Sequence, residues 1–319
     1  MTPFWPLSRW NPRTPRCRAG TFLIAAGLGL VLTGCGSTSE TAAAPTPAGS
    51  STTPSESVSP TSSSTQDRPR PTGSPRPMGH IHGVGRDATT GDVVLATHGG
   101  LFRIDASGPT PVGPVVDLMG FAIAADGSYL ASGHPGTTTE LPNPVGLIRS
   151  TDGGATWTSL SRGGESDFHG LSAGSGLVAG FDGTLRVSTD GGRTWEARRM
   201  PSAPHVLAVS ASSERVLATT QDGLLHSDDG GASWTRVTTP ELLVAVHWAD
   251  DETVAGVDVA GRLVLSEDGG TTWRTGPTSL GEVQAVHASR TPDGVEVLAV
   301  AGDAVLRTTD LGATTERLL

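Results

Sequence analysis

The chain has 319 residues and a formal net charge of −10, and all 22 of its basic side chains are arginines. A protein this acidic repels phosphate backbones, so we do not expect it to bind nucleic acid. Aromatic residues make up only 4%, whereas 43 glycines and 23 prolines are typical of short strands joined by tight turns rather than of a helical bundle.

The N-terminal segment predicts export and lipidation. An arginine-containing stretch precedes the apolar run Thr21–Leu32, which as a helix spans about 18 Å and cannot cross a membrane core of about 30 Å. Residues 1–34 are therefore predicted to be a signal peptide. The tetrad Leu32–Cys35 (LTGC) resembles the bacterial lipobox. That resemblance implies a diacylglycerol on the Cys35 thiol and a lipid-anchored location on the extracytoplasmic face of the cell membrane.

Residues 35–77 are predicted to form a disordered tether behind the lipid. They are rich in Ser, Thr and Pro and hold too few apolar residues to offset the entropy of ordering. Fully extended, at roughly 3.1 Å per residue, such a tether reaches about 130 Å from the membrane. Because Cys17 is removed with the signal peptide and Cys35 carries lipid, we expect no disulfide in the domain that follows.

Residues 78–319 consist of repeated sequence units. Four octets share one pattern of Ser, an acidic residue, two glycines and Trp: Ser150–Trp157 (STDGGATW), Ser188–Trp195 (STDGGRTW), Ser227–Trp234 (SDDGGASW) and Ser266–Trp273 (SEDGGTTW). A fifth copy, Thr308–Thr315 (TTDLGATT), lacks the Trp. The octet is identified as the Asp-box, or BNR repeat, which is found in sialidases, sortilin-like receptors and the photosystem II assembly factor. Its aspartates recur about every 40 residues, at Asp152, Asp190, Asp229, Asp268 and Asp310.

The Asp-box is predicted to be structural. Its carboxylate can accept backbone N–H groups in a tight turn, its glycines permit positive φ, and its Trp can pack against the neighbouring sheet. Recurring carboxylates taken alone would suggest calcium binding or catalysis. The position of the box at the turn between the third and fourth strand of each unit favours the structural role instead.

Six units of about 40 residues predict a six-bladed β-propeller, all-β in class. The units begin near His80, Leu118, Phe168, Val206, Val244 and Val283, and the first lacks a proper Asp-box. In the fourth unit the four strands are predicted at Val206–Val209, Val216–Thr219, Leu224–Ser227 and Trp234–Val237. Each unit runs through its strands in order, so no strand exchange is expected to close the ring, and we expect a monomer.

Propeller topology sorts the histidines onto one face. The chain enters each first strand from the face that also carries the loops between second and third strands, whereas the Asp-boxes lie on the opposite face. Five histidines map to the first of these faces in units one to three: His80, His82, His98, His134 and His169. The acids Asp167 and Asp182 join them, and Glu140 lies in a long insertion, residues 134–146, that would overhang the same face.

This face supports two interpretations of the histidines. The first is a pocket for acid–base catalysis or for a divalent metal, with His80, His82 and His169 as candidate ligands, because a His-x-His strand places two imidazoles on one side. The second is that the rings pack between blades or bond to loop carbonyls. The remaining histidines are assigned no role: His205, His226, His247 and His287.

A family resemblance bears on the choice. The segments HIHGVG, ATHGGLF, SGHPG, LPNPVGLIRSTDGG and ESDFHGL resemble a group of bacterial Asp-box proteins known as glycosyl hydrolases, over residues 78 to about 200. The resemblance implies a sialidase-superfamily propeller with glycosyl-hydrolase-like activity on an extracellular glycan, which is an argument from fold. Sialidase chemistry itself is not expected, because the lone Tyr129 lies within a predicted strand and no Phe/Tyr-Arg-Ile-Pro segment occurs.

Two function classes therefore stay open for the same face. A two-carboxylate glycosidase would draw on Asp167, Asp182 and Glu140, with carboxyl groups about 5–5.5 Å apart for retention or about 6.5–9.5 Å for inversion. The alternative is a non-catalytic propeller that binds a glycan or a protein, or serves as an assembly scaffold.

Overall fold

The computed structural model describes residues 76–137, 139–174 and 176–319. All described residues belong to one unit, Pro69–Leu319. The predicted signal peptide, the predicted lipidation site Cys35 and nearly all of the predicted tether therefore lie outside the described residues. Within those residues no helix meets the length and apolarity that a membrane span requires.

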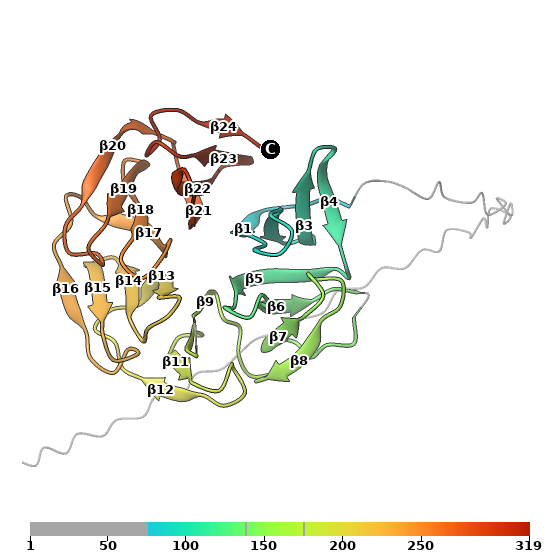
Figure 1. Ribbon diagram of the computed structural model, residues 1–319. Helices are drawn as coiled ribbons and strands as arrows, with labels where there is room; N and C mark the ends of the chain where they lie inside the picture. The colour runs from blue at the N-terminus through green and yellow to red at the C-terminus, as the bar shows by residue number, and fades with distance from the viewer. Residues whose placement is uncertain (1–75, 138, 175) are drawn as a thin grey trace, which may run out of the picture. The chain divides into compact units, whose positions relative to one another are not determined.

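The described residues form six four-stranded antiparallel sheets arranged in a ring, shown in Figure 1. Blade one consists of β1 (Ile81–Arg86), β2 (Val93–Thr97), β3 (Gly100–Asp105) and β4 (Gly108–Val112), and blade two of β5 (Val116–Ile123), β6 (Tyr129–Pro135), β7 (Leu147–Ser150) and β8 (Thr158–Ser161). Blade three consists of β9 (Gly170–Ala173), β10 (Val178–Phe181), β11 (Leu185–Ser188) and β12 (Glu196–Arg198), and blade four of β13 (Pro204–Val209), β14 (Val216–Thr220), β15 (Gly223–Ser227) and β16 (Thr235–Val237). Blade five consists of β17 (Leu243–Trp248), β18 (Val254–Asp258), β19 (Arg262–Ser266) and β20 (Arg274–Ser279), and blade six of β21 (Val283–Thr291), β22 (Gly294–Ala301), β23 (Ala304–Thr308) and β24 (Glu316–Arg317).

The first strand of each blade lies innermost and contacts the first strands of the two neighbouring blades, including β21 with β1. Five of these strands carry a bulge at the same register position, at His82, Met119, His205, Val244 and Gln284. A bulge bends the strand and increases its twist, which lets the strand enter the crowded centre of the ring. The predicted six-bladed propeller is confirmed.

The ring closes by side-chain contacts between blades one and six. Every sheet is made of four consecutive strands, so no strand is exchanged across the closure. Ile81, Val84 and Phe102 of blade one share a buried core cluster with Leu298 and Val300 of blade six. Such a cluster removes apolar area of both blades from water and so opposes separation of the first blade from the last.

An ion-pair network reinforces this closure. The carboxylate of Glu296 on β22 is only 3% exposed and accepts from Arg86 Nε on β1 and from Arg307 Nε on β23, each at 2.5 Å. Arg307 also donates to Glu316 on β24 at 3.0 Å. The buried acid thus joins the first and last blades through one charged group.

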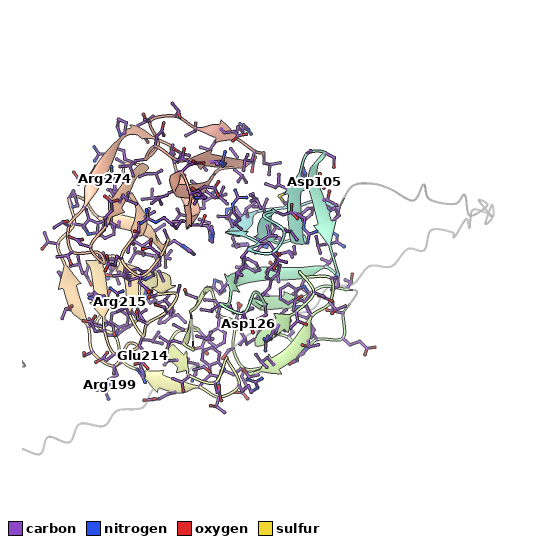
Figure 2. The ribbon with its side chains drawn as sticks, viewed as in Figure 1. Asp105, Asp126, Arg199, Glu214, Arg215 and Arg274 are labelled. Atoms are coloured by element: carbon purple, nitrogen blue, oxygen red, sulfur yellow. The ribbon has the colours of Figure 1, made fainter. Side chains whose placement is uncertain are left out.

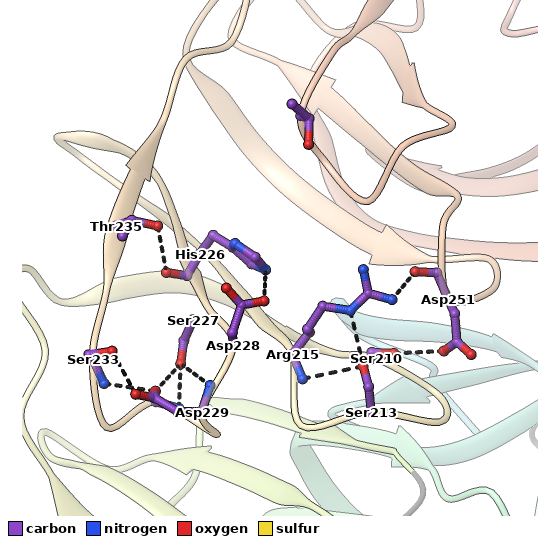
Figure 3. A network of polar contacts seen from close by, with 12 residues as sticks. Ser210, Ser213, Arg215, His226, Ser227, Asp228, Asp229, Ser233, Thr235 and Asp251 are labelled. Atoms are coloured by element: carbon purple, nitrogen blue, oxygen red, sulfur yellow. Dashed lines mark hydrogen bonds and ion pairs between the residues drawn. The ribbon is translucent and has the colours of Figure 1, made fainter. Parts of the chain in front are cut away.

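Each Asp-box folds as a hydrogen-bonded turn, and that of blade four is drawn in Figure 3. Asp229 Oδ1 accepts from the Ser233 backbone N–H at 2.8 Å and from the Ser227 hydroxyl at 2.8 Å, and Oδ2 accepts from the Ser233 hydroxyl at 2.6 Å. Gly230 and Gly231 adopt φ of 65° and 87°, a region that L side chains rarely enter. The equivalent bonds of Asp152 lower its pKa to about 2, so that carboxylate stays ionised.

Arginines link neighbouring blades on the Asp-box side. Arg215 of blade four donates to the Asp251 backbone carbonyl of blade five (Figure 3). Its guanidinium also lies 5.0 Å from the centre of the Trp248 ring. Other charged side chains, such as Arg199 and Arg274, lie at the outer rim of the ring (Figure 2). The Asp-box side therefore includes contacts that join neighbouring blades.

Candidate functional site

Three histidines of blade one meet at the mouth of the ring on the face opposite the Asp-boxes. His80 and His82 lie at the start of β1, and His98 directly follows β2, so the hairpin register places them together. Each offers a ring nitrogen, and these nitrogens all lie within 4.8 Å of one another. His82 Nε2 and His98 Nε2 are 3.2 Å apart, within hydrogen-bond range.

The backbone holds this trio in place. His98 N–H donates to the His80 carbonyl at 3.2 Å, and Gly99 N–H donates to the Met78 carbonyl at 2.8 Å. Gly79 has a φ of 70°, and a Cβ built there would lie 3.0 Å from Cβ of His98. A glycine is needed at position 79 both for its dihedral and for the close approach of His98.

Charge at the trio is set by burial and by an aspartate of the next blade. Burial, followed by the neighbouring His98 and His80, lowers the pKa of His82 to about 4, so that this ring is neutral at physiological pH. His98 Nδ1 lies 2.8 Å from Asp117 Oδ1 on β5. A neutral His98 that donates from Nδ1 to this carboxylate presents the lone pair of Nε2 toward His82.

A second cluster lies at the start of blade three. Asp167 Oδ2 is 2.8 Å from His169 Nε2 and 3.2 Å from His134 Nε2, and Nδ1 of His134 is 2.9 Å from Asn143 Oδ1. The other oxygen of Asp167, Oδ1, is buried without a hydrogen-bond partner. Most of the predicted candidates of this face thus belong to two contact clusters, and His169 contacts Asp167 rather than forming part of the His80, His82 and His98 trio.

The remaining predicted acids stand apart from both clusters in their contacts. Asp182 Oδ2 accepts from Arg186 Nε at 2.7 Å and from the Ser166 hydroxyl at 2.6 Å, and its side chain is 8% exposed. Burial alone would raise the pKa of Asp182, but the hydrogen bonds from Ser166 and Arg186, the positive charge of Arg186 and the Thr184 N–H together lower the pKa below its ordinary value. Glu140 is exposed on the insertion between β6 and β7.

The six first strands enclose a cavity of about 280 Å³ at the ring centre. His82, His169 and His205 line it, as do His247 and His287. The last two are half-buried, lie at matching positions of β17 and β21, and pack with ring centroids 4.4 Å apart. Burial lowers the pKa of His247 to about 4 and that of His287 well below its ordinary value. From the sequence we had predicted no role for these two histidines or for His205.

Sequence reasoning also missed Asp117 and Met119, although a signal was present. The blades one, two and three begin with H-I-H-G, D-L-M-G and D-F-H-G at the same register position. Aligning the units on these tetrads places Asp117 in line with His80 and Asp167. It also places Met119 in line with His82 and His169.

Comparison with known proteins points to one family for part of the chain. The profile of the family described as photosynthesis system II assembly factor YCF48 matches residues 165–275, which run from before β9 into β20. The photosystem II assembly lipoprotein Ycf48 of Synechococcus sp. (strain CC9902) is 35% identical over 104 residues, covering 29% of this chain. The chain spans 31% of the length of that relative.

Solved structures share the architecture at low sequence identity. YCF48 bound to D1 peptide superposes with a TM-score of 0.49 and 17% identity, covering 75% of this chain and 82% of that one. An ancestral GH74 enzyme superposes with a TM-score of 0.50 and 13% identity, covering 73% of this chain and 37% of that one. The likeness to the glycoside hydrolase concerns the fold alone. The expected glycosyl-hydrolase character therefore gains no support beyond the propeller itself.

Proposed function

We propose that the chain is a membrane-tethered, non-catalytic BNR-type propeller that binds a protein partner during assembly of a membrane complex, through the face that carries the two histidine clusters. The observation that carries the proposal is the match of blades three to five to an assembly-factor family, together with a relative named an assembly lipoprotein. The predicted lipid on Cys35 would hold the propeller near membrane partners.

The geometry around the predicted catalytic acids favours binding over hydrolysis. A glycosidase general acid requires a raised pKa, whereas the pKa of Asp182 is lowered by its bonds to Ser166 and Arg186. Asp167 is shared between two imidazoles, His134 and His169. These acids already have partners in the free protein, and such occupied groups suit a preorganised polar binding surface.

The histidine face also offers the exposed groups that a partner needs. The side chains of His98, His134 and His169 are 46%, 45% and 62% exposed. On the opposite face the Asp-box carboxylates are occupied by their own turns, as at Asp190, which accepts from Thr194 N–H and hydroxyl at 2.9 and 2.7 Å. We therefore assign partner binding to the histidine face.

Site-specific photocrosslinking in the native bacterium tests this assignment. A photoreactive residue at Glu140, exposed beside the histidine face, is expected to crosslink the full chain to one defined membrane protein. The matched control is the exposed Ala232 of an Asp-box, whose side chain makes no hydrogen bond and which is expected to give no such adduct. Equal crosslinking from both positions would contradict the proposal. So would glycan hydrolysis by the purified chain that Asp167→Asn abolishes.

A further inference from the structure

We propose that His80, His82 and His98 form a binding site for a divalent transition-metal ion of the zinc and copper class. Imidazole nitrogen is a preferred ligand of these ions, whereas Mg²⁺ and Ca²⁺ prefer oxygen. The site needs no partner protein, so it stands or falls independently of the proposed function.

The spacing of the nitrogens fits a common ion. Metal–imidazole bonds of about 2.0–2.1 Å place two tetrahedral ligand nitrogens about 3.3 Å apart. His82 Nε2 and His98 Nε2 are already 3.2 Å apart. All three ligand nitrogens lie within 4.8 Å of one another, and His80 is exposed. A shift of its ring by at most about 1.5 Å brings the third nitrogen to the spacing that the same ion requires.

The surroundings of the trio match those of metal-bound histidines. Such a ring usually bonds to a carboxylate through its second nitrogen, which fixes the tautomer and raises the basicity of the ligating nitrogen. His98 makes this contact, with Nδ1 2.8 Å from Asp117 Oδ1. The backbone bonds from His98 to His80 and from Gly99 to Met78 fix the two chain segments before any ion arrives. Little ordering entropy would then oppose binding.

The site is open on one side. His80 and His98 are exposed, so three imidazoles would leave a fourth position of a tetrahedral ion to water or another ligand. Zinc sites with three protein ligands and one open position are of the kind that bind exchangeable ligands, whereas closed four-ligand sites are structural. The ring is held by packing and ion pairs, so we infer an ion that is functional rather than required for folding.

Metal titration of the full chain tests the proposal. The chain is purified through a tag that contains no histidine, stripped with a chelator, and titrated with ZnCl₂ by calorimetry. We expect one equivalent to bind, and we expect His82→Ala and His98→Ala each to weaken Kd at least tenfold. Asp117→Asn should weaken Kd by roughly 10–100-fold, the usual effect of removing an outer carboxylate partner. MgCl₂ should give no binding.

Two matched variants separate this trio from other histidines of the face. His205→Ala removes an imidazole that occupies in blade four the register position of His82 in blade one. His169→Ala removes the imidazole that contacts Asp167. Both are expected to bind zinc as the unmodified chain does. With Cu²⁺, the electron paramagnetic resonance spectrum should show coupling to three nitrogens, reduced to two in His80→Ala. No stoichiometric binding, or a loss in His169→Ala equal to that in His98→Ala, would overturn the proposal.

Discussion

Substituting Glu296 by Gln is expected to weaken the closure of the propeller ring. Glu296 is 3% exposed and receives Arg86 from blade one and Arg307 from its own blade. Removing the charge leaves two guanidinium groups without their carboxylate and keeps a polar side chain in the same space. The substitution therefore tests the electrostatic link between the first and last blades with little change in packing.

The magnitude follows from the burial of the three groups. Breaking a buried ion pair by removing one partner costs about 3–5 kcal/mol. Arg86 is 25% exposed and Arg307 is 40% exposed, and Arg307 keeps its bond to Glu316. Water can solvate both arginines in part, so we expect a loss of about 2–3 kcal/mol in the free energy of unfolding. For a domain of this size that corresponds to a fall in Tm of about 5–10 °C.

Urea unfolding followed by tryptophan fluorescence measures this loss. The matched control is Glu316→Gln, whose side chain is 60% exposed and pairs with Arg307 alone, and which should change stability by less than about 0.5 kcal/mol. If Glu296→Gln unfolds at the same urea concentration as the unmodified chain, the ion-pair network does not contribute to closure. The shared apolar cluster of blades one and six would then account for closure without it.

Three further outcomes are expected. Cys35→Ser should move the chain from the membrane fraction to the soluble fraction on cell fractionation, because the predicted lipid attaches to that thiol. Tyr129→Phe should cost about 1–2 kcal/mol in urea unfolding, because the buried Tyr129 hydroxyl donates to Asp87 and its loss leaves that carboxylate one donor short. The pKa of His247 is about 4 in the folded chain against 6.5 in the unfolded one, so the unfolded state binds more protons between these values and stability falls as the pH drops. The fall from pH 7.5 to 4.5 should reach about 2.5 kcal/mol for this residue and should be smaller by that amount in His247→Gln.

The fold was predictable because its signal is local and repeated. In unit four, the strands expected at Val206–Val209 and Val216–Thr219 are observed at Pro204–Val209 and Val216–Thr220. Each Asp-box marks one turn between third and fourth strands, and six repeats of this length leave the propeller as the natural closure. The closure without strand exchange followed from the same order of strands in every unit.

The sequence predicted on which face of the propeller the histidines lie, but not which of their side chains contact one another. Strand direction alone places His82, His98 and His169 on one face of the ring. Which rings meet depends on register and on the bulge at His82, which sets the direction of that side chain. The register of the β1–β2 hairpin brings His98 next to His82. His169 belongs to blade three and pairs with Asp167 instead.

Contacts across blades were beyond reach for a further physical reason. His247 and His287 are separated by 40 residues, and only the alignment of β17 with β21 stacks their rings. Asp117 meets His98 across the interface of blades one and two in the same way. A pattern within one repeat predicts its own turns, but a side-chain pair between repeats depends on the twist of two sheets.

The two faces of the ring differ in how many of their polar side chains stay exposed. On the Asp-box face, carboxylates such as that of Asp229 accept hydrogen bonds within their own turns, and Arg215 donates to a backbone carbonyl of the next blade. On the histidine face, the side chains of His98, just after β2, and of His134, near the end of β6, are 46% and 45% exposed while their partners hold them in position. Loops on a rigid scaffold can vary without loss of the fold. A propeller fold alone does not fix a function, so under our proposal the side chains of the histidine face, rather than the Asp-boxes, determine what this chain binds.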